Sequence, residues 1–225
     1  MIIHDNHLYV ANLGDCKAKL FKRQFEGEKL VYEPLKITIT HNASKFYEQD
    51  RLREKFKGEE DIIIDKGRAC YVKGRLQPTK TLGDFYMKKK EFNNPPDNAE
   101  ERYFKRVIDN FNGPYIESSP DVQVFELTNE DEFLVLATDG LWDWLNSKDV
   151  ADIISRKNDD KKNIAETLVK EALYRAAESR NLKYEQLMHL PQEIKRSIHD
   201  DITILVVDLK NQVVYNKNSI KDLKI

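Results

Sequence analysis

The sequence is poor in cysteine, carries almost no net charge and contains no long apolar run. Its 225 residues include only two cysteines, Cys16 and Cys70, which do not form a CxxC pair. The lack of a CxxC pair disfavours a thiolate zinc site. Two cysteines are too few for a disulfide framework, so we expect a reducing, intracellular compartment. The sequence does not distinguish the cytoplasm from the mitochondrion.

Charge and hydropathy exclude further classes of partner. The net charge of −2, from 37 basic and 39 acidic residues, gives no electrostatic reason to expect a nucleic acid or an anionic membrane as a partner. No apolar stretch approaches the roughly 20 residues that a membrane-spanning helix needs. Hydrophobic residues make up 40% of the chain and charged residues 34%, which is typical of a globular protein with a core of useful size.

One short apolar run leads directly into acidic residues. Residues 133–143 read FLVLATDGLWD, which predicts a buried strand that ends in a tight turn. Asp139 then stands at the strand end and Asp143 four residues later, with Gly140 letting the backbone turn between them. Two interpretations are open. Either Asp139 caps the helix or turn that follows, or these carboxylates hold a hard cation.

The same arrangement recurs near both ends of the chain. Asp200 and Asp201 lead into an apolar, β-branched strand at 202–207. Asp15 follows a predicted strand at 8–13 through a glycine turn. Carboxylates that gather at strand ends repel one another unless they are protonated or bind a metal. The three strand ends together therefore favour a metal site over simple capping.

Several motifs carry a resemblance to a known family. They are LYVANLGD (8–15), GRL (74–76) with TLGDF (81–85), ATDGLWD (137–143) and DDIT (200–203). In order and spacing they resemble four successive motifs of the metal-dependent protein phosphatases of type 2C. The resemblance covers roughly residues 1–209, and the segment 163–201 resembles the pyruvate dehydrogenase phosphatase-like branch and related plant enzymes.

The resemblance implies a more specific fold than the residue pattern alone predicts. The pattern shows a mixture of short strands and helices, which indicates an α+β domain. The family implies a four-layer αββα sandwich, in which helices flank two antiparallel sheets and the metals lie at one edge. We expect this phosphatase-like domain over residues 1–209 and a polar tail over 210–225. The family's early Asp-Gly-His-Gly-Gly motif does not occur, so we expect the C-terminal portion of such a domain, without its N-terminal part.

The resemblance also implies an activity and ligands. The activity is dephosphorylation of phosphoserine and phosphothreonine in proteins by a metal-activated water, with two or more Mg²⁺ or Mn²⁺ ions. Asp139 and Asp200 correspond to direct ligands of one metal. Asp15 and Asp143 correspond to residues that hold a weaker, further metal in some members. No catalytic residue beyond these metal ligands is identified.

The resemblance implies supporting roles for other residues near the motifs. The supporting residues are Asp84, Gly140 and Asp201. Asp84 lies in a Gly-Asp turn where a hydrogen-bonding role is favoured over ligation, and Asp201 stands where the family usually has Asn. Lys80 replaces a common Arg, so its positive charge is retained. We expect His199 to support a metal ligand without touching the metal, or to lie on the surface, and we expect no partner for His41.

The expected partners are a phosphoprotein substrate and an N-terminal segment that bears the absent motif. In the family, that motif supplies a metal-bridging aspartate and a histidine thought to act as general acid. The chain alone is therefore expected to hydrolyse phosphate esters poorly. The alternative is a pseudophosphatase that acts as a binding or regulatory module. Robust Mn²⁺-dependent turnover by the chain alone, lost in Asp139→Asn, would contradict the expectation of poor hydrolysis.

Local signals predict further elements along the chain. Asp5 and Asn6 predict the turn of a hairpin over residues 2–10. A helix capped by Asn42 or Ser44 is expected to end near Gly58. Further expected elements are a short helix at 103–108, a strand at 122–127, and helices that carry the apolar stripes 150–154 and 164–176.

Overall fold

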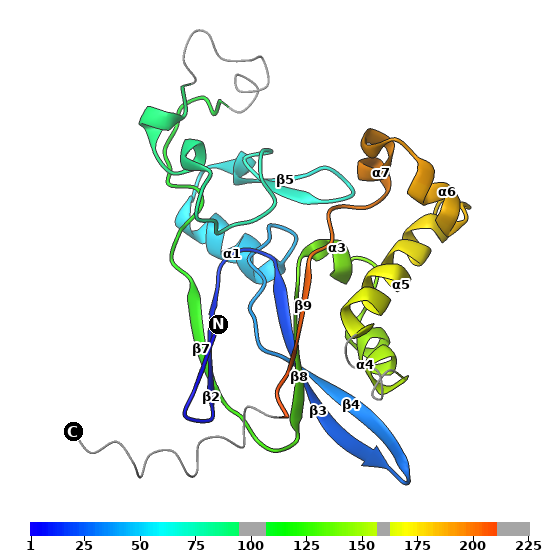
Figure 1. Ribbon diagram of the computed structural model, residues 1–225. Helices are drawn as coiled ribbons and strands as arrows, with labels where there is room; N and C mark the ends of the chain where they lie inside the picture. Colours follow the sequence, from blue (N-terminus) through cyan, green and yellow to red (C-terminus); the bar gives the residue numbers. More distant parts are fainter. Residues whose placement is uncertain (95–106, 157–162, 211–225) are drawn as a thin grey trace, which may run out of the picture. The chain divides into compact units, whose positions relative to one another are not determined.

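The computed structural model describes residues 1–94, 107–156 and 163–210 (Figure 1). The strands are β1 (Ile2–His4), β2 (His7–Asn12), β3 (Lys17–Glu26), β4 (Lys29–Lys36), β5 (Ile63–Asp65), β6 (Cys70–Val72), β7 (Asp121–Glu126), β8 (Asp131–Ala137) and β9 (Ile204–Asp208). The α-helices are α1 (Phe46–Lys55), α3 (Asp139–Trp142), α4 (Ser147–Arg156), α5 (Ile164–Glu178), α6 (Tyr184–His189) and α7 (Gln192–Ile198). Short 3₁₀ helices cover Glu60–Ile62, Phe85–Met87 and Lys90–Phe92.

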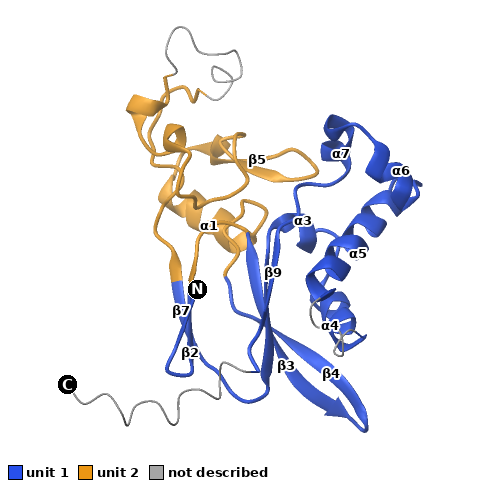
Figure 2. Ribbon diagram, in the orientation of Figure 1, with its two compact units in different colours: residues 1–10, 16–38, 122–225 blue, residues 11–15, 39–121 orange. Residues whose placement is uncertain are grey.

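The chain divides into two compact units (Figure 2). Unit 1 comprises residues 1–10, 16–38 and 122–225, and unit 2 comprises residues 11–15 and 39–121.

The expectation of one domain over 1–209 stays a prediction. The expected tail lies outside the described residues except for Lys210. No helix in the described part of the chain is long and apolar enough to cross a membrane.

Unit 1 contains two antiparallel sheets, apart from residues 11–12 of β2 and residue 121 of β7, which belong to unit 2. The larger has the strand order β4-β3-β8-β9, and the smaller has the order β1-β2-β7. Strand β8 pairs with β3 on one side and β9 on the other, and nearly all of its residues are buried. A strand that is covered on both faces needs consecutive apolar residues rather than alternation. This explains the uninterrupted apolar run that precedes Asp139.

Alternate residues of the larger sheet serve two cores. Leu20 and Leu134 join Leu8 of β2 in the core between the two sheets. Their neighbours Phe21 and Phe133 face the opposite way and pack with side chains of α3, α4 and α5. Successive side chains of a strand point to opposite faces, so one sheet can serve both cores. The described part of unit 1 therefore has a sheet, a second sheet and a helical layer.

The predicted α+β class, with antiparallel sheets flanked by helices, is confirmed. The described residues of unit 1 supply three of the four layers that the resemblance implied. On the smaller sheet, four apolar side chains are exposed, namely Ile2 (66%), Tyr9 (39%), Val122 (65%) and Val124 (52%). An apolar sheet face of this kind is a surface on which further chain can pack.

Unit 2 is rich in loops and has its own core. The hairpin of β5 and β6 packs with α1 around buried side chains that include Leu52, Val72, Met87 and Tyr115. Helix α1 begins after Lys45, which has extended backbone, rather than after Asn42 or Ser44. The predicted cap is wrong because the Asn42 side chain has other hydrogen-bond partners, described below.

Other local predictions can also be compared with the structure. Asp5 and Asn6 both have left-handed backbone, with φ of 46° and 59°, as the predicted two-residue hairpin turn requires. The predicted strand at 122–127 and the two helices that carry the apolar stripes are present as β7, α4 and α5. The helix expected at 103–108 lies largely outside the described residues.

Candidate functional site

The Asp139 turn begins where β8 ends. Thr138 has extended backbone, and Asp139 is the first residue of the one-turn helix α3. The Asp139 carboxylate oxygen Oδ1 accepts a hydrogen bond from the Gly140 amide at 2.9 Å. Asp143 follows the helix, and its amide donates to the Asp139 carbonyl at 2.9 Å. The two aspartates thus stand at the two ends of a single helical turn.

Gly140 is needed for a different reason from the predicted one. It lies inside α3 with negative φ, so the turn does not require the conformational freedom of glycine. An added Cβ would lie only 2.5 Å from the backbone oxygen of Asp201 and 3.2 Å from Cγ1 of Ile202. Glycine at this position therefore lets the chain around Asp201 pass close to α3.

Thr138 joins the two segments that carry Asp139 and Asp200. Its amide donates to the Thr203 carbonyl, its hydroxyl donates to the Asp201 carbonyl, and this hydroxyl accepts from the Thr203 amide, each at 3.1 Å. These bonds extend the pairing of β8 with β9 beyond the strand ends (Figure 1). The segments bearing the two predicted ligands therefore lie side by side in unit 1.

The Asp200 segment is exposed and its acids have local partners. Asp200 Oδ1 accepts from the Asp201 amide at 2.8 Å, so it is oriented in the same way as Asp139. The Asp201 carboxylate pairs with the Arg196 guanidinium at 3.2 Å. The extra negative charge expected at this position is thus partly balanced by Arg196. His199 bonds through Nδ1 to the Asp200 carbonyl at 2.8 Å, and its expected role, in support of a metal ligand or on the surface, stays a prediction.

In unit 2, Asp15 lies in a turn that needs glycine for its backbone conformation. Gly14 has φ of +94°, in the left-handed region that favours glycine. The Asp15 carboxylate accepts a hydrogen bond from the Asn42 side-chain nitrogen at 2.8 Å. The Gly14 carbonyl also accepts from the His41 amide at 3.0 Å. Two consecutive residues from another part of the chain thus contact this turn.

His41 was expected to have no partner, and this prediction is wrong. Its side chain is fully buried, and Nε2 bonds to the Asp121 carboxylate. The ring nitrogen Nδ1 accepts a hydrogen bond from the Gly14 amide at 3.2 Å. The same Asp121 oxygen accepts from Lys80 Nζ at 3.1 Å. The hydrogen bond from His41, followed by that from Lys80, holds the pKa of Asp121 below its ordinary value against the opposing effect of burial.

The Asp84 turn of unit 2 is held by a lysine. Asp84 has left-handed backbone, with φ of 55°, and its carbonyl accepts from the Met87 amide at 2.9 Å. Lys88 Nζ donates to the Thr81 carbonyl at 2.5 Å and to the Ser118 hydroxyl at 2.6 Å. Burial lowers the pKa of Lys88, and the nearby charge of Asp84 opposes this shift. Lys88 thus holds this loop, while the role of Asp84 itself stays a prediction.

Comparison with known proteins identifies the family. The family described as "Protein phosphatase 2C" matches residues 1–181. The chain belongs to the protein phosphatase 2C family. It is 33% identical to "Probable protein phosphatase 2C 38" of Arabidopsis thaliana, over 99% of this chain and 56% of that protein. It is 32% identical to "Probable protein phosphatase 2C 72" of Oryza sativa subsp. japonica, over 96% of this chain and 53% of that protein.

The chain spans about half the length of the curated relatives it matches. Two solved structures share its fold. "Structure of a C.elegans sex determining protein" gives a TM-score of 0.58 at 17% identity, over 95% of this chain and 40% of that one. "Crystal structure of serine-threonine phosphatase 2C from Toxoplasma gondii" gives 0.53 at 19% identity, over 91% of this chain and 55% of that one. At these identities the likeness shows the protein phosphatase 2C fold alone.

Members of the protein phosphatase 2C family are generally metal-dependent, and part of this chain suits such ions. Asp139 and Asp200 offer carboxylate oxygens, the donor type that Mg²⁺ and Mn²⁺ prefer. Within residues 1–94, 107–156 and 163–210, no group of three or more His, Cys, Asp or Glu side chains is placed to hold a metal ion. The convergence of Asp15, Asp139, Asp143 and Asp200 on one site therefore stays a prediction.

Proposed function

We propose that Asp139 and Asp200 hold Mg²⁺ or Mn²⁺ in a protein phosphatase that acts on phosphoserine and phosphothreonine. The observation that supports this proposal is the set of hydrogen bonds through which Thr138 joins the two segments. When bound, the cation would stabilise negative charge on the phosphoryl oxygens and lower the pKa of a water molecule. Asp139 and Asp200 would bind and orient that cation.

Each proposed ligand is oriented by the amide of the next residue. In Asp139 and Asp200 alike, Oδ1 accepts that amide, which limits rotation of the carboxylate. Arg196 holds the neighbouring acid Asp201 in an ion pair. We propose Asp15 and Asp143 as ligands of a further, weaker cation.

The proposal includes a requirement for a further segment. The sequence contains no Asp-Gly-His-Gly-Gly motif, to which the family resemblance assigns the bridging aspartate and the general acid. We therefore propose that the chain corresponds to the C-terminal portion of the phosphatase domain, in the pyruvate dehydrogenase phosphatase-like branch, and hydrolyses poorly alone. The exposed apolar face of the β1-β2-β7 sheet supports packing of such a segment there.

Metal binding by the 225-residue chain tests the ligand assignment. Mn²⁺ binding, followed by electron paramagnetic resonance and calorimetry, is expected to be lost in Asp139→Asn and in Asp200→Asn. The double variant should lose no more than either single one, because both carboxylates would serve one ion. Asp152→Asn, which changes an exposed acid of α4, is the matched control and should bind normally. Unchanged binding in Asp139→Asn would contradict the proposal.

Complementation tests the activity. A segment with Asp-Gly-His-Gly-Gly, taken from a relative and co-expressed with the chain, is expected to give Mn²⁺-dependent hydrolysis of a phosphopeptide. Asp139→Asn should abolish that hydrolysis. A complemented protein that binds Mn²⁺ through Asp139 without hydrolysis would instead indicate the pseudophosphatase function.

A further inference from the structure

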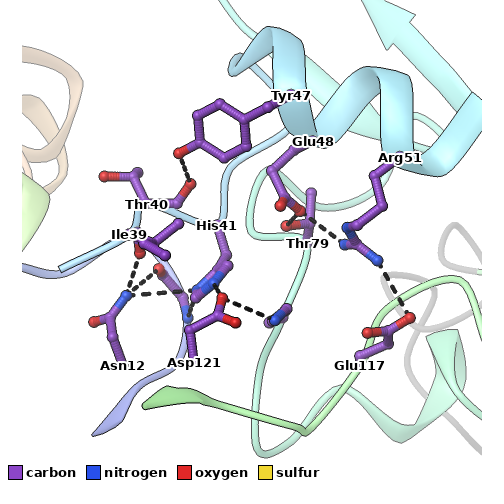
Figure 3. A network of polar contacts seen from close by, with 12 residues as sticks. Asn12, Ile39, Thr40, His41, Tyr47, Glu48, Arg51, Thr79, Glu117 and Asp121 are labelled. Atoms are coloured by element: carbon purple, nitrogen blue, oxygen red, sulfur yellow. Dashed lines mark hydrogen bonds and ion pairs between the residues drawn. The ribbon is translucent and has the colours of Figure 1, made fainter. Parts of the chain in front are cut away.

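The Gly14–Asp15 turn is held by two consecutive side chains whose roles differ. His41 contacts the backbone of Gly14, and Asn42 contacts the carboxylate of Asp15. Figure 3 shows part of this network, in which Asn12 and Asp121 contact different nitrogens of the His41 ring. All of these residues belong to unit 2.

The hydrogen bonds assign the proton on the His41 ring. Two N–H groups are directed at Nδ1, namely the Gly14 amide at 3.2 Å and the Asn12 side-chain nitrogen at 3.5 Å. Nδ1 must therefore be an acceptor, and the ring proton is on Nε2. Nε2 donates this proton to the Asp121 carboxylate, which can only accept. The ring is thus fixed in one tautomer and one orientation.

Asp121 is itself anchored, so the orientation of the ring does not depend on one bond. Lys80 Nζ donates to the same carboxylate oxygen and is largely buried. The His41 side chain has 0% exposure, so water cannot replace its partners. A buried ring with both nitrogens satisfied holds its neighbours more rigidly than an exposed one.

The amide of Asn42 is oriented by two hydrogen bonds. Its oxygen accepts from the Ser44 amide at 2.9 Å. The nitrogen of the same side chain must then face the other way, where it donates to Asp15 Oδ2 at 2.8 Å. Asn42 therefore holds Oδ2 of the Asp15 carboxylate and limits the rotation of that carboxylate.

We propose that His41 and Asn42 are positioning residues for Asp15 as a metal ligand. His41 fixes the backbone of the turn through Gly14, and Asn42 fixes the rotation of the carboxylate. This inference rests on the proposed function, in which Asp15 holds the weaker cation. Groups that orient a metal ligand in this way usually affect metal affinity strongly, although they do not touch the metal.

A matched pair of substitutions separates the two bonds of the His41 ring. The amide of His41→Asn reaches about as far along the side chain as Nδ1 and can still accept from Gly14. The amide of His41→Gln reaches about as far as Nε2 and can donate only to Asp121. Mn²⁺ affinity that depends on Asp15 should be kept within about threefold in His41→Asn and weakened by about 10- to 100-fold in His41→Gln. Equal affinity in the two variants would overturn the role of His41.

Asn42→Ala tests the second contact. It should weaken the same Mn²⁺ binding by about 10- to 100-fold without moving the Gly14 amide. Asn93→Ala is the control for general destabilisation, because the Asn93 side chain is buried in unit 2, where it donates to the Ile108 carbonyl and accepts from the Ile108 amide. Loss of affinity in both variants would show that Asn42 acts only through stability, which would overturn its positioning role.

Hydrogen exchange at the Gly14 amide provides a readout that does not depend on metal. This amide should be protected in the native chain and in His41→Asn, and should exchange faster in His41→Gln. Should Asp15→Asn leave Mn²⁺ binding unchanged, the assignment of Asp15 as a ligand fails, and with it the proposal for this site. Faster exchange in His41→Gln would then still confirm the contact of His41 with the turn. Equal exchange in all forms would overturn that contact independently of the metal.

Discussion

The two turns that carry predicted metal ligands are held by different parts of the chain. In unit 1, the Asp139 turn is fixed mainly by backbone, because β8 and β9 are paired almost up to the turn and Thr138 continues the pairing. In unit 2, the Gly14–Asp15 turn is fixed mainly by the side chains of His41 and Asn42. The first arrangement depends on strand register and the second on individual polar groups.

This difference determines what each turn tolerates. A turn held by paired strands tolerates most side-chain substitutions that leave the pairing intact. It does not tolerate a change in strand register. A turn held by buried side chains is sensitive to the loss of any one donor or acceptor, because its partner is left unsatisfied. Gly140 and Gly14 show the contrast most directly, since each is required for a different reason.

The largest effect is expected for Gly140→Ala. The new Cβ would lie 2.5 Å from the Asp201 backbone oxygen, and one of the two segments must move. We expect a loss of about 1–3 kcal/mol of stability, together with weaker Mn²⁺ binding at Asp139. Denaturant unfolding and hydrogen exchange at the Thr203 amide would measure these effects. Gly83→Ala is the control, because a Cβ at Gly83 meets nothing within 4 Å and should be nearly neutral.

Gly14→Ala should have a smaller effect with a different cause. Here the nearest atom to a new Cβ is the Lys80 carbonyl oxygen at 3.5 Å, so there is room for the side chain. The cost comes from the positive φ and should be about 1–2 kcal/mol. Gly14→Asn should cost less, since asparagine tolerates left-handed backbone better than alanine. If Asn and Ala cost the same in unfolding experiments, steric contact rather than conformation limits this turn.

The backbone-held turn was largely predictable from sequence. The apolar run before Asp139 predicted a buried strand because a strand covered on both faces leaves a continuous apolar signal. Asp5 and Asn6 predicted their hairpin turn because few residues adopt left-handed backbone. The reason for Gly140 was not predictable, because it depends on Asp201, a residue far away in the sequence.

The side-chain network of unit 2 left no such signal. His41 and Asp121 are 80 positions apart, and neither belongs to a periodic pattern that would indicate a contact. A single buried histidine looks the same in sequence as a solvated one. Asn42 was misread as a helix cap because asparagine before a helix favours capping, whereas its amide bonds to Ser44 and Asp15. The roles of His41 and Asn42 therefore depend on tertiary contacts, which local propensity does not predict.

The Asp121 carboxylate should make the stability of the side-chain network in unit 2 sensitive to acid. The pKa of Asp121 is lower in the folded chain than its ordinary value of 3.8. Ionised Asp121 therefore favours folding above that value, and its contribution is lost as the pH falls through the lower folded pKa. Asp121→Asn should reduce stability at neutral pH and flatten its decline below about pH 4. The Gly14 amide exchange rate, measured against pH, would report this change locally.

Asp149 is a carboxylate of unit 1 that can be compared with Asp121. The hydrogen bonds from Arg175, at 2.8 and 3.0 Å, lower the pKa of Asp149 in the same direction. Asp149→Asn should flatten the acid response of amides in α4 and leave the pH dependence at Gly14 unchanged. A change at Gly14 in Asp149→Asn would mean that the acid response is global and not local to each network.

The smallest effect is expected for Asp201→Asn, which restores the residue that the family resemblance places there. The Asp201 carboxylate is 71% exposed and its ion pair with Arg196 is similarly open to solvent. Exposed pairs contribute about 0–1 kcal/mol, so stability should hardly change. The contacts that fix the backbone here use the Asp201 carbonyl, which the substitution leaves in place. Removing one negative charge beside Asp200 should weaken Mn²⁺ binding by less than about threefold, since the change is screened by solvent. Calorimetric titration of both forms at low and moderate ionic strength would measure it. A large loss of affinity would mean that Asp201 is itself a ligand, and that the Asp200 segment of unit 1 depends on individual side chains as strongly as the Gly14–Asp15 turn of unit 2 does.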